Sequence, residues 1–104
     1  MAKMNMQKML KQARQMQEEM AKAQEEVALL EAEASAGGGV VKVVAAGNGS
    51  IKRVSIRPDV VDPDDTEMLE DLIVAATNEA LQQVNELSQA RMDAVTGGFD
   101  LPGF

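Results

Sequence analysis

The chain has 104 residues, which is enough for one small domain spanning residues 1–104. Its residues are 45% apolar, and its net charge at pH 7 is −7. The sequence contains no cysteine, histidine, tryptophan or tyrosine, which removes disulfides, thiol nucleophiles, the commonest general base and most metal ligands. It also has no apolar run of the ~18–20 residues that a membrane span needs. We therefore expect a cytoplasmic protein that is not an enzyme, with no catalytic residues, no metal or other cofactor, no small-molecule substrate and no membrane partner.

A long amphipathic helix is predicted from about Ala2 to Leu30, because glycine and proline are absent and good helix formers dominate. Its apolar residues recur in alternating steps of three and four, which is the heptad pattern of a helix seam. The seam comprises Met6, Met9, Ala13, Met16, Met20, Ala23, Val27 and Leu30. Such a helix spans roughly 43 Å at ~1.5 Å per residue and overhangs a compact domain of this size. Its seam therefore needs a partner, either the second helix or another copy of the chain, and the candidate dimer contacts are Met6, Met9, Met16, Met20 and Val27.

The opposite face of the same helix is basic. Every charged residue among the first 17 is a lysine or arginine, whereas every charged residue from 58 to 90 is acidic. On a helical wheel of ~100° per residue, the side opposite the seam carries Lys3, Lys8, Lys11, Arg14 and Lys22, which we call the basic stripe. Such a separation of charges is more informative about binding partners than the net charge is. A cluster of basic side chains can bind the phosphates of a nucleic acid. An ordinary solvated helix face explains the stripe equally well.

Residues 31–36 alternate with period two and predict a short strand, which leads through three glycines into a β-hairpin. The hairpin is predicted because two strand-forming runs meet at Asn48-Gly49, a pair that suits a type I′ turn with φ > 0 at both central residues. The expected register pairs Gly47 with Ser50, Ala45 with Lys52, Val43 with Val54 and Val41 with Ile56. One face would then carry Val41, Val43, Ala45, Val54 and Ile56, apolar except for Lys52 beside the turn, and would pack against a helix. The other would carry Lys42, Arg53, Ser55 and Arg57, with Val40, Val44 and Ile51 among them.

A second helix is predicted over residues 62–96, with Asp62 as its N-cap, Pro63 in its first turn and two glycines after its end. The acidic residues at its start interact favourably with the positive end of the helix dipole, which is consistent with a helix N-terminus. Their spacing does not match that of a calcium-binding loop. Its apolar seam is Leu69, Leu72, Ile73, Ala76, Ala80, Val84 and Leu87, enough to cover one face of the sheet. Residues 97–104 form a short apolar tail whose role the sequence leaves open.

Several ordered segments resemble the YbaB/EbfC family of bacterial nucleoid-associated proteins. The resemblance runs over nearly the whole chain and begins with the methionine-, glutamine- and lysine-rich opening helix. The further segments are GGGVVKV at 37–43, a G-x-G turn at 47–49, VSIRP at 54–58, EMLEDLIVAATNEAL at 67–81 and TGG at 96–98. Arg57 departs from the family pattern, in which an acidic residue is common before that proline.

The resemblance implies an α+β protomer of the order α-β-β-β-α, with long first and last helices and a three-stranded antiparallel sheet. It also implies a homodimer with projecting helices, DNA binding and a cytoplasmic, nucleoid-associated location. Under this hypothesis the phosphate ligands are Lys3, Lys8, Lys11, Arg14 and Lys22, with Arg91 of the second helix as a further candidate. If these side chains do not bind, the DNA would have to meet Lys42, Arg53 and Arg57. The alternative is a protein-interaction module whose methionine seam binds a partner helix.

Overall fold

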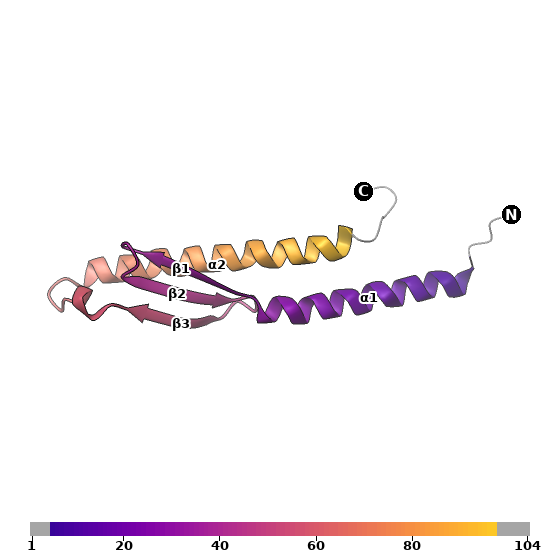
Figure 1. Cartoon of the computed structure of the whole chain (residues 1–104), viewed down its shortest axis with the longest axis horizontal. Helices are drawn as coiled ribbons and strands as arrows, with labels where there is room; N and C mark the ends of the chain where they lie inside the picture. The colour runs from indigo at the N-terminus through magenta and orange to yellow at the C-terminus, as the bar shows by residue number, and fades with distance from the viewer. Residues whose placement is uncertain (1–4, 98–104) are drawn as a thin grey trace.

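The computed structural model describes residues 5–97 and has the α-β-β-β-α order that the sequence predicted (Figure 1). Helix α1 spans Met6–Leu29 and is followed by strands β1 (Glu31–Ala36), β2 (Val41–Ala46) and β3 (Ile51–Ile56). A short 3₁₀ helix, η1 (Pro58–Val60), precedes helix α2 (Thr66–Gly97). The strands form one antiparallel sheet in the order β1-β2-β3. The expected α+β fold is therefore confirmed.

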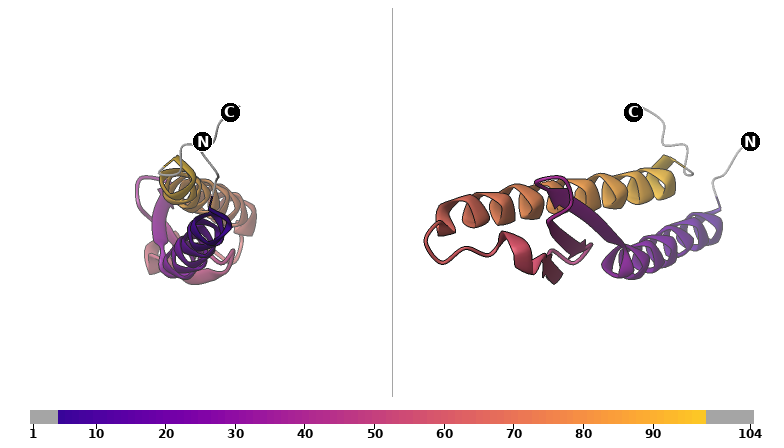
Figure 2. Two further views of the ribbon diagram at one scale, coloured as in Figure 1. Left: turned by 90° about the vertical axis from the view of Figure 1, so that its right-hand side faces the viewer. Right: turned by 60° about the vertical axis from the view of Figure 1, so that its left-hand side comes forward.

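The protomer is long and thin. Its principal extents are 79 × 22 × 16 Å and its radius of gyration is 21.0 Å, against about 13 Å for a compact chain of ~100 residues. Helix α2 covers one face of the sheet and then continues beside α1, which runs in the opposite direction (Figures 1 and 2). The first turns of α1 extend beyond the end of α2 (Figure 1). The sheet and the start of α1 therefore lie at opposite ends of the protomer.

The core lies between α2 and the first two strands and is built largely from alanine and valine. Its buried members are Ala32, Ala34, Val41, Val43, Ala45, Ala76, Ala80 and Val84. The alternation predicted for β1 is confirmed, since Ala32 and Ala34 are buried whereas Glu31, Glu33 and Ser35 are exposed. Small side chains let the helix approach the sheet closely, so the core is thin and each side chain in it has close neighbours on both layers.

Strand β3 is not part of this core, and here the sequence prediction was wrong. Val54 and Ile56 lie on the same sheet face as Val43 and Val41 but remain 43% and 36% exposed. A helix about 10 Å across covers roughly two strands spaced ~4.8 Å apart, and α2 packs on β1 and β2. On the other face, Val44 is only 6% exposed, between its cross-strand neighbours Glu33 and Arg53.

The turn between β2 and β3 also differs from the prediction. Asn48 does not have a positive φ, so the turn is not type I′, and only Gly49 adopts the left-handed region, at φ 87°. The amide of Gly49 donates to the carbonyl of Ala46 (3.0 Å), and the amide of Ala46 donates to the carbonyl of Ser50 (2.8 Å). The loop therefore has three residues, 47–49, which is one more than expected. Gly49 supplies the positive φ that this turn needs, and the Asn48 side chain accepts a hydrogen bond from the Ser50 amide at 3.0 Å.

A β-bulge farther along the hairpin compensates for the extra loop residue and restores the predicted pairing register. Ala45 pairs with Ile51 and Val44 with Arg53, so Lys52 is the unmatched residue. The predicted pairs Val43–Val54 and Val41–Ile56 are confirmed, whereas the pairs predicted for Ala45 and Gly47 were wrong. The bulge keeps the apolar side chains at the far end of the hairpin on the core face.

The boundaries of both helices differ from the sequence prediction because polar side chains use the backbone amides nearby. Helix α1 begins at Met6, since the side chain of Asn5 accepts from the Gln7 amide at 3.1 Å and caps the helix. Helix α2 begins at Thr66 and not after Asp62, because the Asp62 carboxylate accepts from the Asp64 amide (2.9 Å) in a separate turn. The predicted tail, apart from Gly97, lies outside the described residues.

The later half of α2 turns a different face inward than the heptad pattern predicted. Leu87 is 48% exposed, whereas Val95 is only 6% exposed and Ser88 and Arg91 are half-buried. The reason is a change of partner: up to Val84 the helix packs on the sheet, and beyond it the helix packs on α1.

Gly47 holds the hairpin against the end of α1. Its amide donates to the carbonyl of Leu30 (2.8 Å), and a Cβ at this position would collide with the carbonyl oxygen of Val27. The Ser88 hydroxyl of α2 lies on the same side, 3.4 Å from that Cβ position. The glycine is thus required for close approach of three elements.

We expect Gly47→Ala to destabilise the fold by about 1–3 kcal/mol, the usual cost of forcing backbone apart to fit an added atom. Urea unfolding followed by far-UV circular dichroism would measure it. Gly97→Ala is the matched control, because a Cβ there meets nothing within 4 Å, and it should leave the midpoint unchanged or slightly raised. Equal midpoints for both variants would show that the packing at Gly47 is not tight.

Candidate nucleic-acid interface

The basic stripe lies on the part of α1 that projects from the domain. Lys8, Lys11 and Arg14 are all exposed, and Lys22 is exposed closer to the sheet. Lys3, the remaining member, lies outside the described residues. Gln7, Leu10, Lys11 and Arg14 line a shallow hollow on the helix surface. The three cations therefore stand on two successive turns, with their charged groups in solvent.

No acid neutralises these cations within residues 5–97. That part of the chain contains two ion pairs, Arg57–Asp59 and Arg91–Glu26, and neither involves the basic stripe. The first acidic residue of α1 is Glu18, about one turn after Arg14. Lys8, Lys11 and Arg14 are thus available for an anion that approaches from solvent.

Arg91 has a different environment from the stripe. Its Nε donates to Glu26 Oε2 at 2.6 Å, and the two side chains are 33% and 42% exposed. This charged hydrogen bond holds the pKa of the Glu26 carboxyl below its ordinary value and raises the pKa of Arg91. The pair joins α1 to α2, so the structure places Arg91 in a helix–helix contact.

The methionine seam of α1 is divided by the end of α2. Ala23 is buried, and Met16, Met20 and Val27 are half-buried along the stretch beside α2. Met6 and Met9 lie past that stretch and remain 76% and 47% exposed. The expected overhang of the seam is therefore present, and among residues 5–97 it is the first two turns of α1 that have no covering element.

Two apolar surfaces were not anticipated from the sequence. Leu10 is 54% exposed beside Met6, at the edge between the seam and the basic stripe. The second surface is the β3 apolar strip, which consists of Ile51, Val54 and Ile56, exposed by 39%, 43% and 36%. The alternating pattern of β3 correctly predicted the face of Val54 and Ile56 but wrongly placed Ile51 on the other face, because the bulge at Lys52 interrupts the alternation. Pattern alone also does not reveal how many strands a helix covers.

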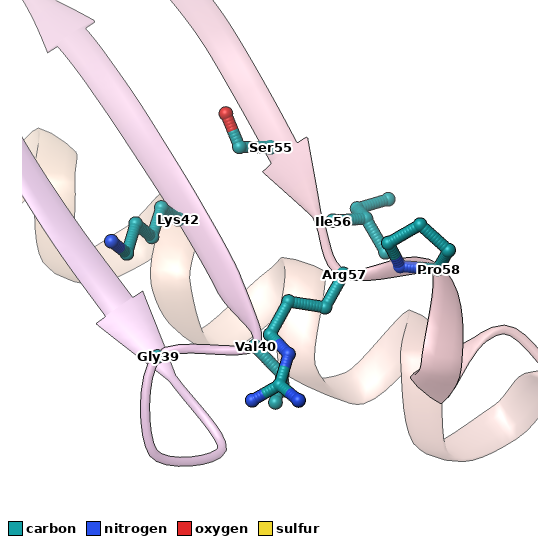
Figure 3. A pocket seen from close by; sticks show the side chains of 7 residues that line it. All are labelled: Gly39, Val40, Lys42, Ser55, Ile56, Arg57 and Pro58. Carbon is teal, nitrogen blue, oxygen red and sulfur yellow. The ribbon is translucent and has the colours of Figure 1, made fainter.

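The far end of the sheet has a basic hollow of about 280 Å³ on its surface (Figure 3). It is lined by Gly39, Val40, Lys42, Ser55, Ile56, Arg57 and Pro58. Lys42 and Ser55 are cross-strand partners, and the Arg57 amide donates to the Val40 carbonyl at 2.9 Å. Two cations and one hydroxyl thus line one small hollow.

Two further findings concern the described part of the chain. Neither of its helices contains a stretch long and apolar enough to cross a lipid bilayer. Over residues 5–97, no three acidic side chains come close enough together to hold a metal ion.

Comparison with known proteins assigns the chain to a family. A profile of the YbaB/EbfC DNA-binding family matches residues 1–99. A nucleoid-associated protein of Ruminiclostridium cellulolyticum is 49% identical over 95% of this chain and 87% of its own length. One from Acetivibrio thermocellus is 51% identical over 95% of this chain and 88% of its own.

The fold also matches a solved structure. The crystal structure of an uncharacterized protein from Helicobacter pylori superposes with a TM-score of 0.68 and 20% sequence identity, covering 85% of this chain and 92% of that one. This likeness supports the fold alone. The family profile matches residues 1–99, and the two relatives are 49% and 51% identical to this chain. The chain therefore belongs to the YbaB/EbfC DNA-binding family.

Proposed function

We propose that this protein is a non-enzymatic, nucleoid-associated protein of the cytoplasm that binds double-stranded DNA as a homodimer. The observation that carries the proposal is the set of cations on the projecting turns of α1 that make no ion pair with any residue from 5 to 97, in a chain whose net charge is −7. Membership of a DNA-binding family and the names of the relatives, which are nucleoid-associated proteins, support the same function.

The spacing of the cations suits a phosphate backbone. Lys8 and Arg14 are six residues apart, or about 9 Å along the helix, which corresponds to two or three phosphates at ~3.4 Å per strand position. Phosphate contacts position a duplex without reading its sequence. The only aromatic residues are Phe99 and Phe104 in the tail, so α1 offers no platform for stacking single-stranded bases. The protein should therefore bind many duplexes with similar affinity.

Titration of labelled duplex DNA at several salt concentrations tests this function. Binding through phosphates weakens steeply as salt rises, because each contact releases condensed counterions. An interaction module that used exposed Met6, Met9 and Leu10 to hold a partner helix would bind through apolar burial, which salt does not weaken. Failure to bind duplex DNA even at low salt would contradict the proposal and leave the second function.

The homodimer is proposed from the β3 apolar strip and the overhanging seam. The strip continues the core face of the sheet but lacks a helix above it within the described chain, and a second copy would supply one. An alanine-rich core buries little area per residue, so covering the strip adds stability that a lone protomer lacks.

We expect the protein to sediment as a dimer at micromolar concentration and Val54→Lys to shift it toward the monomer. The Val54 side chain is 43% exposed, so a lysine fits in the monomer but places a charge in the proposed interface. Sedimentation equilibrium measures the mass. Ser55→Lys adds the same charge on the opposite face of β3 and should stay dimeric. A monomeric wild-type protein would rule out the homodimer, and a dimeric Val54→Lys would place the interface elsewhere.

A further inference from the structure

The sheet face turned away from α2, which we call the outer sheet face, concentrates positive charge. Lys42 of β2 and Arg53 of β3 lie on it, Lys52 is the unmatched residue of the bulge, and Arg57 follows β3. Four of the chain's ten basic residues fall between positions 42 and 57, and that stretch contains no acidic residue. In a chain with 17 acidic residues, such a separation gives β2 and β3 a locally positive surface.

The acidic residues near this surface lie at its margins. Glu31 and Glu33 are on β1, the strand on the far side of β2, and Glu33 shares a row with Val44 and Arg53. None of Lys42, Lys52 and Arg53 makes an ion pair with any residue from 5 to 97. The next row across the sheet, Ser35, Lys42 and Ser55, contains a cation flanked by two hydroxyl groups.

The hollow in Figure 3 lies at the corner of this face and supplies donors for an anion. The Arg57 guanidinium donates two hydrogen bonds to the Asp59 carboxylate, from Nη2 at 2.7 Å and from Nε at 3.1 Å. A guanidinium has five N–H donors, so three remain after both bonds to Asp59 are made. Lys42 and Ser55 line the same hollow. The residues that line the hollow therefore include three donor types that bind phosphate: an ammonium group, a guanidinium group and a hydroxyl.

The basic stripe and the outer sheet face are both turned away from α2. The stripe is opposite the seam of α1, whose buried Ala23 lies on the side where α1 meets α2. The outer face is opposite the sheet face that α2 covers. Between Arg14 and the sheet, α1 carries Glu18, Lys22 and Glu25, so the end of the stripe nearest the sheet is of mixed charge. The two basic surfaces thus succeed each other along the long axis of the protomer.

We propose that the outer sheet face is a second phosphate-binding zone for the same duplex that the basic stripe binds. One duplex then lies along the protomer on the side away from α2. From Lys8 to Leu30 is about 33 Å of helix, and β2 adds about 17 Å of strand. At ~3.4 Å per base pair this track requires roughly 15 base pairs. The inference rests on the proposed function, because it assigns a second binding zone to the same ligand.

The test compares two double variants that change the net charge equally. Lys42→Gln/Arg53→Gln removes two cations from the outer sheet face. Asn78→Asp/Asn85→Asp adds two acids on exposed positions of α2 and serves as the control. Salt titrations are made with duplexes of 24 and 8 base pairs, because only the longer one can reach both zones.

On the 24-base-pair duplex, the sheet variant should bind at least about tenfold more weakly at 0.1 M salt. Its log–log salt slope should be shallower than that of the control by about 1.8, because two phosphates are no longer neutralised. The wild-type slope should be steeper on 24 than on 8 base pairs. A sheet variant that matches the control overturns the inference, as does a wild-type slope that does not grow with duplex length. Wild-type protein that binds neither duplex instead contradicts the proposed function, and the inference falls with it.

Discussion

Replacing Lys8, Lys11 and Arg14 by glutamine is expected to weaken binding to every duplex tested by a similar factor. It should also flatten the log–log salt dependence by about 0.9 for each phosphate that is no longer neutralised, and by up to twice that if both protomers of a dimer engage. The three side chains are exposed and unpaired within residues 5–97, so their replacement removes charge without leaving an unmatched partner. Helix content should hardly change, because glutamine is nearly as good a helix former as lysine or arginine.

Glu25→Gln is the control for this triple variant. Glu25 is exposed on the same helix but lies nearer the sheet. Removing its negative charge should leave the affinity for DNA unchanged or slightly higher. A triple variant that folds normally and keeps the original affinity and salt slope would show that the stripe is an ordinary solvated face. The DNA would then have to be bound by Lys42, Arg53 and Arg57 alone.

Val43→Asp is expected to unfold the protein or abolish its assembly. Val43 is fully buried between the sheet and α2, opposite Val54 in the hairpin register. A buried carboxylate without a partner costs several kcal/mol, a large part of the ~5–15 kcal/mol that stabilises a typical domain. Thermal unfolding and sedimentation would reveal the loss.

Ser55→Asp provides the matched comparison, since it adds the same charge to an exposed position on the outer sheet face of the same hairpin. That variant should melt close to the wild-type temperature. If Val43→Asp also kept the wild-type melting temperature and mass, the hairpin register and the position of the core would both be incorrect.

The hairpin illustrates how far sequence reasoning reaches. Alternation in β2 and β3 predicted the Val43–Val54 and Val41–Ile56 pairs, because a shift of one residue would have mixed apolar and polar faces. It did not predict the three-residue loop or the bulge at Lys52. Those features cancel each other in register, so the pattern at the far end of the hairpin is the same with or without them.

Burial across the sheet was harder to predict because it depends on where the helix lies. The sequence shows that α2 has an apolar face, but the lateral position of the helix follows from packing against Ala32 and Ala34 of β1. That position leaves Val54 and Ile56 exposed. The change of packing partner that exposes Leu87 and buries Val95 likewise depends on the path of α1, which the heptad pattern does not contain.

For the candidate interface, the basic residues could be predicted from the sequence, but their contacts with other elements could not. Charge segregation singled out Lys8, Lys11 and Arg14, and the wheel placed them opposite the seam. The wheel could not show that Arg91 faces Glu26, since the two residues lie 65 positions apart and meet only when α2 folds back beside α1.

The thin alanine layer under α2 has a mechanical consequence. Helix α2 has 32 residues and is about 48 Å long, and Ala76 and Ala80, in its first half, pack on the sheet. A larger side chain there, for instance in Ala76→Leu, would push this half of α2 away from the sheet and tilt the half that packs on α1. Because α1 packs on that second half, we expect one added side chain in the sheet layer to change the angle at which α1 leaves the domain. We therefore expect the size of the side chains in this layer to influence the direction in which the projecting cations point.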